Sequence, residues 1–190
     1  KVKDEAREAL KAEKEARETL KELKKMSFAQ ATHHMAELCE SIIENPQEAL
    51  SANVHSLLYL ATKRDDTQHA ATLSLLAVFC DILPSYRIRL PTEQELSVKA
   101  SKEVQRLRDY ESTLLKTYQE YLRFLESQWK QHEDVACMLC LCQLLQKAYT
   151  FNFCNNLMEI IAQSMHLPSV SEACCNAMQT VLTEAAQGTL

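Results

Sequence analysis

The stretch DILPSYRIRLPTEQE, residues 81–95, interrupts a sequence whose composition otherwise favours helix. It holds Pro84 and Pro91, whereas the whole chain of 190 residues has 4 prolines and 1 glycine. Proline removes a backbone donor and disfavours helix at the residue before it, so Pro84 ends one helix and Pro91 keeps the chain upstream of it extended. Residues 84–92 are therefore predicted to form an extended linker loop in an otherwise all-α protein.

Between the two prolines, apolar and basic side chains alternate. Tyr86, Ile88 and Leu90 take turns with Arg87 and Arg89. Side chains of an extended chain point to opposite sides in turn, so the first set is expected to lie on the helices and the two guanidinium groups to face away. Arginine is suited to both carboxylates and phosphates. Two interpretations stay open: pairing with acids of this chain, or contact with a partner protein or RNA.

The loop leads into the longest predicted element, a helix over residues 93–131. Thr92 and Glu95 have the spacing of a capping box, which marks its start. Apolar residues recur along it at near-heptad spacing, as expected of a strut that packs along several shorter helices. Its polar face carries basic residues, among them Lys102, Arg106 and Arg108. A solvated face and a phosphate-contacting or partner-contacting face are both compatible with this pattern.

Upstream of the loop, residues 27–83 are predicted to form the first helical repeats. Apolar residues recur at the three- and four-residue spacing of one buried helical face: Phe28, Ala31, Met35, Leu38 and Ile42. The pair Asn45-Pro46 ends that helix and begins the next, since proline is well tolerated at the first helical position. Three helices of similar length joined by short turns resemble an array of the HEAT or armadillo type.

Downstream of the strut, residues 132–190 are predicted to form the C-terminal helical repeats. The segment FNFCNN, residues 151–156, turns a corner between two of these helices. Its polar residues, Asn152, Asn155 and Asn156, can bridge the turn backbone and a helix N-terminus. The alternative is that this corner presents a partner surface, as the linker loop does in its functional interpretation.

The first residues carry many charged side chains of both signs over an alanine and leucine background. Residues 1–26 are accordingly predicted to form a charged, solvated helix, with a basic or RNA-touching arm as the alternative. The net charge of the whole chain is −5, so no general basic excess draws it to nucleic acid. No Lys or Arg follows Lys147.

Other classes of protein fit the sequence less well. No apolar run approaches the roughly 18 to 20 residues needed to cross a bilayer, and nothing resembles a signal peptide, so no membrane contact is predicted. The chain begins with Lys, from which we expect it to be a piece of something longer. Its 8 cysteines lie among apolar helical residues, which is typical of free thiols in a reducing compartment.

Chemistry-bearing motifs are weak. The run with Cys137, Cys140 and Cys142 lies mid-helix and is apolar, which favours buried thiols over a zinc site. His33 and His34 share Glu37 at helical spacing but lack the further ligands of a metal face. A phosphate-cradling glycine loop is impossible with 1 glycine. We therefore predict no catalytic residue, cofactor, metal or small-molecule substrate, and no enzymatic activity.

Several ordered motifs nevertheless resemble one known family. The run SLLAVFCDILPSYRIRLPTEQELSVKASKEVQRLRDYESTLLKTYQEYLRFLE, residues 74–126, is similar to the central part of the nucleolar complex-associated protein 3 family. LCESIIENPQEAL (residues 38–50), FNFCNN and SEACCNAM (residues 171–178) match its neighbouring blocks. The resemblance covers about residues 24–185. Between WKQ and FNF this chain is shorter than the family pattern, and family members are considerably longer.

The resemblance implies a non-enzymatic helical scaffold of the nucleus and nucleolus. It implies a role in maturation and nuclear export of the precursor of the large ribosomal subunit. The expected partners are the second nucleolar complex-associated protein and pre-60S assembly factors, with pre-rRNA as a further candidate. Members are also tied to initiation of DNA replication through origin-licensing proteins. The competing hypotheses are thus a replication-licensing adaptor and a generic protein-binding solenoid.

Residues expected to contact a partner come from the loop, the strut and the asparagine corner. They are Tyr86, Arg87, Arg89, Lys102, Arg106, Arg108, Asn152, Asn155 and Asn156.

Overall fold

The computed structural model describes residues 18–92, 94–95 and 100–186. The predicted fold class, all-α, is confirmed, because the described residues contain helices and no strand. The helices with full bounds are α2 (Phe28–Glu44), α3 (Pro46–Lys63), α4 (Gln68–Ile82), α6 (Lys102–His132), α7 (Val135–Lys147), α8 (Cys154–Ser164) and α9 (Ser171–Ala186). A short helix over residues 18–25 precedes them.

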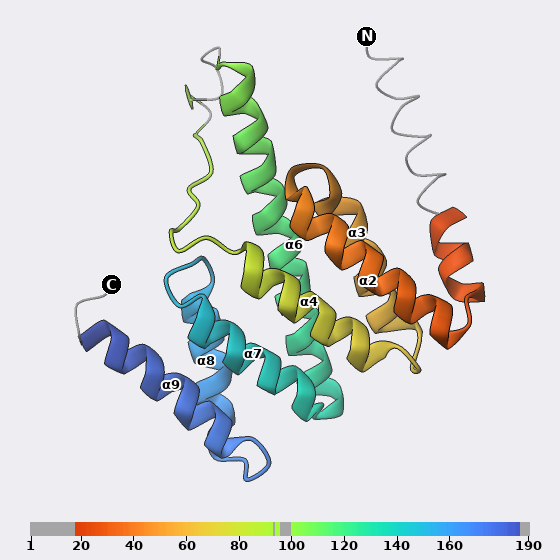
Figure 1. The fold of residues 1–190 in the computed structure, drawn as a ribbon. Coiled ribbons are helices and arrows are strands. Elements are labelled where there is room, and N and C mark those ends of the chain that lie inside the picture. Colours follow the sequence, from red (N-terminus) through yellow and green to blue (C-terminus); the bar gives the residue numbers. More distant parts are fainter. Residues whose placement is uncertain (1–17, 93, 96–99, 187–190) are drawn as a thin grey trace.

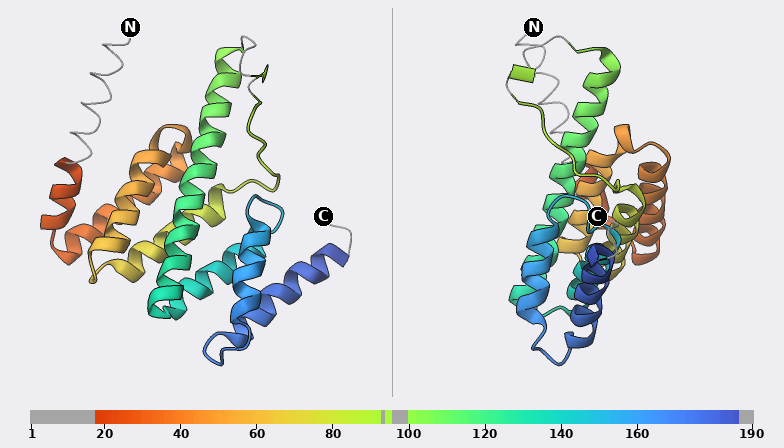
Figure 2. Two further views of the ribbon diagram at one scale, coloured as in Figure 1. Left: turned by 180° about the vertical axis from the view of Figure 1, so that it is seen from behind. Right: turned by 90° about the vertical axis from the view of Figure 1, so that its left-hand side faces the viewer.

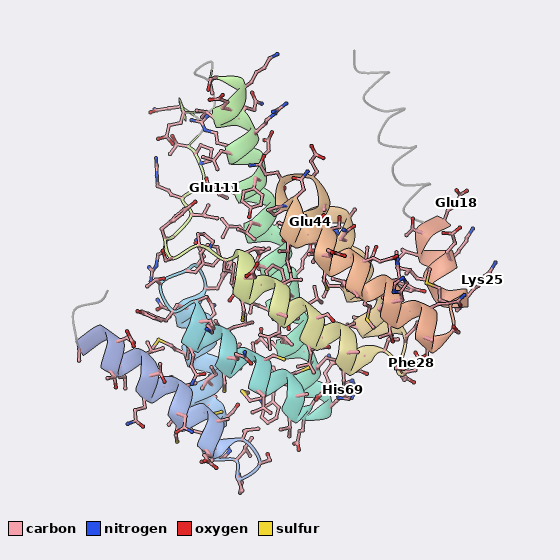
Figure 3. The ribbon with its side chains drawn as sticks, viewed as in Figure 1. Glu18, Lys25, Phe28, Glu44, His69 and Glu111 are labelled. Carbon is pink, nitrogen blue, oxygen red and sulfur yellow. The ribbon has the colours of Figure 1, made fainter. Side chains whose placement is uncertain are left out.

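The first three of these helices form one group in which α2, α3 and α4 all contact one another. Ser27 begins α2 through a capping box with Gln30, and Pro46 occupies the first turn of α3, as predicted. The apolar face predicted for α2 is buried at Ala31, Met35, Leu38 and Ile42. Phe28 was also predicted to lie on that face and is 54% exposed instead, because it is the first residue of α2, where Figure 3 shows it.

In the described part of the N-terminal charged helix, the Lys and Glu side chains are exposed and one apolar residue packs on the core. Leu23 is fully buried in the common core. Arg64, in the turn after α3, donates from Nη1 to the carbonyl oxygens of Leu23 at 2.9 Å and Met26 at 2.8 Å. These bonds satisfy carbonyls that a helix end leaves without partners. Residues 1–17, which carry the rest of the predicted solvated helix, lie outside the described residues.

The long strut is present as α6, but it begins at Lys102 rather than at residue 93. The Ser101 hydroxyl accepts a hydrogen bond from the Val104 N–H at 3.3 Å, and Ser101 itself is extended. A serine that satisfies an orphan N–H in this way sets a helix start. At the other end, Glu133 adopts a left-handed conformation, with φ 51°, and closes the helix.

A second group of three follows, in which α7, α8 and α9 contact one another. The two groups meet through α4 and α7 and through α6, which packs on both α3 and α7. Figure 1 shows α6 running behind α4, and in the reverse view of Figure 2 it lies in front. The HEAT or armadillo arrangement and the predicted unit boundaries stay predictions.

An aromatic cluster fills the junction of the two groups. The Phe79 ring on α4 lies 5.3 Å from the ring centroids of both Tyr118 and Tyr121 on α6. Phe151, before α8, packs on Tyr118 at 5.6 Å. The Tyr121 hydroxyl donates to the carbonyl oxygen of Thr72 at 2.8 Å. All four rings are fully buried, so this cluster is the centre of the core.

Candidate functional site

The linker loop, residues 84–92, is called the strap below. It leaves the end of α4 and runs beside the free end of α6, as Figures 1 and 2 show. The expected alternation is only partly realised: Ile88 is 5% exposed, whereas Tyr86 and Leu90 are 54% and 52% exposed. The reason is that the strap buries one apolar side chain, that of Ile88, rather than lying along a continuous apolar surface.

Asn152 holds the strap at Ile88. The Ile88 N–H donates to Asn152 Oδ1 at 2.9 Å, and Asn152 Nδ2 donates back to the Ile88 carbonyl oxygen at 3.0 Å. The side-chain amide therefore satisfies both backbone groups of a residue 64 positions away. This contact joins the two segments that the sequence singled out, the strap and the asparagine corner, and it assigns Asn152 to intrachain bonding.

Arg89 also has an intrachain partner. Its Nη2 lies 2.7 Å from Glu95 Oε1, while Glu95 Oε2 accepts from the Thr92 N–H at 2.8 Å. The predicted Thr92–Glu95 capping contacts are thus present, since the Glu95 N–H also donates to Thr92 Oγ1 at 3.4 Å. These contacts lower the pKa of Glu95 to about 2. The hydrogen bond from the Thr92 N–H is the larger cause, and the one from Arg89 is the next.

Tyr86 lies on α6 through its hydroxyl. It donates to Glu111 Oε1 at 3.2 Å, and Figure 3 shows Glu111 on the part of α6 that lies beside the strap. The pKa of Tyr86 is raised, mainly by burial of its hydroxyl and secondly by the hydrogen bond to the Glu111 carboxylate. The ring itself stays half exposed, so Tyr86 both fixes the strap and presents an aromatic surface.

Arg87 and the remaining asparagines form the accessible part of the junction. Together with Asn152, Phe153 and Cys154, the residues Arg87, Asn155 and Asn156 line a cavity of about 140 Å³. Arg87, Asn155 and Asn156 are exposed. Within the described part of the chain, their side chains have no hydrogen bond or ion pair. Arg87 is close enough to Cys154 to oppose the rise that burial causes in the pKa of that thiol.

Phe153 begins α8 in an unusual conformation. It is the N-cap residue, with φ 69°, and it supplies no side-chain cap. A left-handed conformation is costly for a bulky residue. Its ring is held 6.1 Å from the ring centroid of Tyr118, which ties the corner to the aromatic core.

The predicted basic residues of the strut lie apart from this junction. Arg108 donates from Nη1 to the Glu95 carbonyl oxygen at 3.4 Å and so belongs to the Arg89–Glu95 contact. Lys102 and Arg106 are exposed on the first turns of α6. The structure therefore brings Arg87 and the three asparagines together around one cavity. Tyr86 lies on α6 instead, and Lys102 and Arg106 stay outside the junction.

Two hollows were not predicted from the sequence. One, of about 230 Å³, lies between α6 and α8 and includes Arg123. The other, of about 520 Å³, lies along α9 and includes Met178 and Leu182. Arg123 belongs to the basic face of the strut, but only the packing of α8 distinguishes it from the other cations there.

Most of the cysteines are buried among the helices. All eight are free, and Cys175 is exposed beside the buried Cys174. Burial is the main cause that raises the pKa of Cys140 to about 11 and of Cys142 to about 12. Across the described ranges, no group of three or more His, Cys, Asp or Glu side chains is placed to hold a metal ion. None of the helices described there is long and apolar enough to cross a membrane.

Comparison with known proteins points to one family. Residues 30–121 match the family model described as Nucleolar complex-associated protein. The chain is 39% identical over 157 residues to Nucleolar complex-associated protein 3 of Arabidopsis thaliana, which covers 80% of this chain and 19% of that protein. It is 32% identical over 190 residues to Nucleolar complex protein 3 homolog of Homo sapiens, covering 85% of this chain and 23% of that protein.

A fungal relative shows the same relationship. Nucleolar complex-associated protein 3 of Saccharomyces cerevisiae is 28% identical over 161 residues, with 77% of this chain and 24% of that protein covered. The chain thus spans about a quarter or less of the length of these curated relatives.

Proposed function

Because the chain belongs to the nucleolar complex-associated protein 3 family, we propose that it is a non-enzymatic scaffold of ribosome biogenesis. Its helices hold a partner surface at the junction of the strap and the asparagine corner. Its partners are other nucleolar complex components, the second nucleolar complex-associated protein first among them, together with pre-60S assembly factors. The process it serves is maturation and export of the large-subunit precursor.

The location expected from the resemblance, nucleus and nucleolus, is confirmed by the names of the relatives. For the partner surface, the carrying observation is the exposed cluster around Arg87, Asn155 and Asn156. Two neighbouring polar side chains, by contrast, are bonded within the chain, Asn152 to Ile88 and Arg89 to Glu95. Exposed polar residues on a rigid scaffold are a common form of recognition surface.

A direct test recovers the tagged full chain from nuclear extract, with and without nuclease, and identifies the accompanying proteins by mass spectrometry. We expect nucleolar complex components and large-subunit assembly factors in both samples. Loss of all partners on nuclease treatment would show association through RNA. Recovery of origin-licensing proteins without assembly factors would overturn the ribosomal assignment in favour of the replication adaptor.

The surface itself is tested by Arg87→Glu, with Lys63→Glu as the charge-matched control. Lys63 is an exposed residue in the last turn of α3, in the other helix group. We expect Arg87→Glu to reduce the recovery of partners severalfold and Lys63→Glu to leave it unchanged. Equal recovery with both variants would remove the junction from the partner surface.

A further inference from the structure

The hollow between α6 and α8, here called the α6–α8 groove, has an aliphatic floor. Leu122 of α6, Leu141 of α7, and Leu157 and Ile160 of α8 form it. Its volume of about 230 Å³ is smaller than the roughly 300 to 1,000 Å³ of small-molecule sites. The groove is therefore matched to one or two side chains rather than to a cofactor.

The rim of the groove is polar, and its uncompensated charge is positive. Gln119, Arg123, Glu126 and Asn156 form the rim. Glu126 is already paired, since Lys130 Nζ lies 2.6 Å from its Oε1. Arg123 is exposed and has no ion pair with any described residue. An acidic group at the rim would gain a free guanidinium partner, whereas a basic group would not.

The groove adjoins the smaller cavity under the strap. Phe153 and Asn156 line both hollows. Arg87 stands at the strap end, so one free arginine flanks each hollow. A chain segment that crosses the shared wall would therefore meet an apolar pocket and two cations in sequence.

We infer that the α6–α8 groove and the strap cavity together bind a short acidic peptide segment of a partner protein. One large apolar side chain of that segment occupies the aliphatic floor, and flanking carboxylates pair with Arg123 and Arg87. The inference rests on the proposed scaffold function and names the chemistry of its partner.

The lining favours a peptide over RNA. Recognition of single-stranded RNA uses several aromatic platforms and a groove of many cations. This groove has Phe153 as the one aromatic residue of its lining, together with an aliphatic floor and an acid on its rim. A carboxylate binds arginine in a bidentate manner, and buried aliphatic anchors are typical of peptide recognition. The larger hollow along α9 lacks any Lys or Arg in its lining, so it offers no charge to select an acidic segment.

The test selects peptides from a random display library on the immobilised full chain and measures the enriched sequences by fluorescence anisotropy. We expect enriched peptides to combine acidic residues with a leucine or aromatic anchor, and their affinity to fall with added salt. Arg123→Glu should weaken binding by about tenfold or more, because it places an acid opposite the peptide's carboxylates. Changing one peptide acid to lysine should restore binding to that variant.

Matched variants keep the result specific. Lys63→Glu should not change the affinity beyond about twofold, the effect expected of a distant exposed charge. Leu182→Asp, on the α9 hollow, should be equally neutral. Arg123 is exposed, so its variant should retain the helical circular dichroism and the unfolding midpoint of the parent.

The inference is overturned if no peptide is enriched, if the enriched peptides are basic or uncharged, or if Leu182→Asp abolishes binding and Arg123→Glu does not. Extract recovery separates it from the proposed function. If nucleolar complex components accompany the Arg87→Glu and Arg123→Glu variants as they do the parent, the peptide site falls and the scaffold function stands. If the parent recovers none of them, the scaffold function falls instead.

Discussion

The aromatic core and the strap are held in place in opposite ways. Phe79, Tyr118 and Tyr121 are buried together from two helices, with several ring contacts for each residue. The strap is held by one buried side chain, Ile88, and by single polar contacts such as that of Asn152. A helix core distributes its stability over many redundant positions, whereas an extended segment depends on a few individual bonds.

The core should show the largest effect. Phe79→Ala removes a fully buried ring that packs on two tyrosines, and we expect it to lower the free energy of unfolding by about 3–5 kcal/mol. Urea denaturation followed by circular dichroism measures this. Leu73→Ala is the control on the same helix, because Leu73 is 51% exposed. A loss for Phe79→Ala no larger than that control would contradict the placement of the ring.

The strap should respond locally. Asn152→Ala removes both hydrogen bonds to the Ile88 backbone, so the free energy for opening the strap should fall by about 1–2 kcal/mol. Hydrogen exchange at the Ile88 amide should accelerate by about tenfold or more. The exchange rates of the core amides should change less. Asn155→Ala is the matched control, since its exposed side chain makes no such bond. Unchanged exchange in Asn152→Ala would show that the Asn152–Ile88 hydrogen bonds are not what holds the strap.

Within the core, two tyrosines one turn apart sharpen the comparison further. Tyr121→Phe removes a bond to the Thr72 carbonyl and should destabilise the protein by about 1 kcal/mol. Tyr118 is fully buried, and its hydroxyl has no partner among the described residues. Tyr118→Phe should therefore be neutral or stabilising by up to about 1 kcal/mol. Thermal unfolding of both variants measures these two changes in stability, which are expected to have opposite signs. A clear loss of stability in Tyr118→Phe would show that the hydroxyl has a partner.

The smallest effect is the pH response of the strap's far end. The pKa of Glu95 is about 2, lowered from 4.5, so its contact with Thr92 and Arg89 is complete above the ordinary value of 4.5. The contact should be lost only as pH falls through about 2. Carboxyl ¹³C chemical shifts during an acid titration measure this pKa directly. Arg89→Ala should raise it part of the way, and Arg87→Ala should not; equal effects of the two variants would rule out the specific pair.

Helix starts and ends were predictable where one local signal decides them. Asn45-Pro46 separates α2 from α3 as expected, because proline acts through its own backbone. The start of α6 was predicted nine residues too early, from the Thr92–Glu95 capping box. The capping contacts are present, but residues 100–101 are not helical and α6 begins after them. Ser101 marks the boundary instead, and a serine is also common inside helices, so its capping role is visible only in the structure.

The candidate site was likewise predictable only where the signal is local. The strap and the asparagine corner stand out in the sequence because prolines, arginines and asparagines are rare around them. Their pairing through Asn152 and Ile88 spans 64 positions, and no local pattern encodes a contact of that separation. The position of Arg123 at a groove was hidden for a related reason, since it depends on where α8 lies against α6.

The sharing of α6 between the two helix groups has a consequence for how the protein comes apart. Its 31 residues extend about 46 Å, and its buried side chains complete the packing of α3 on one side and α7 on the other. Neither group has a finished core without it. We therefore expect both groups to melt in a single cooperative transition, and a backbone break within α6 to release them together.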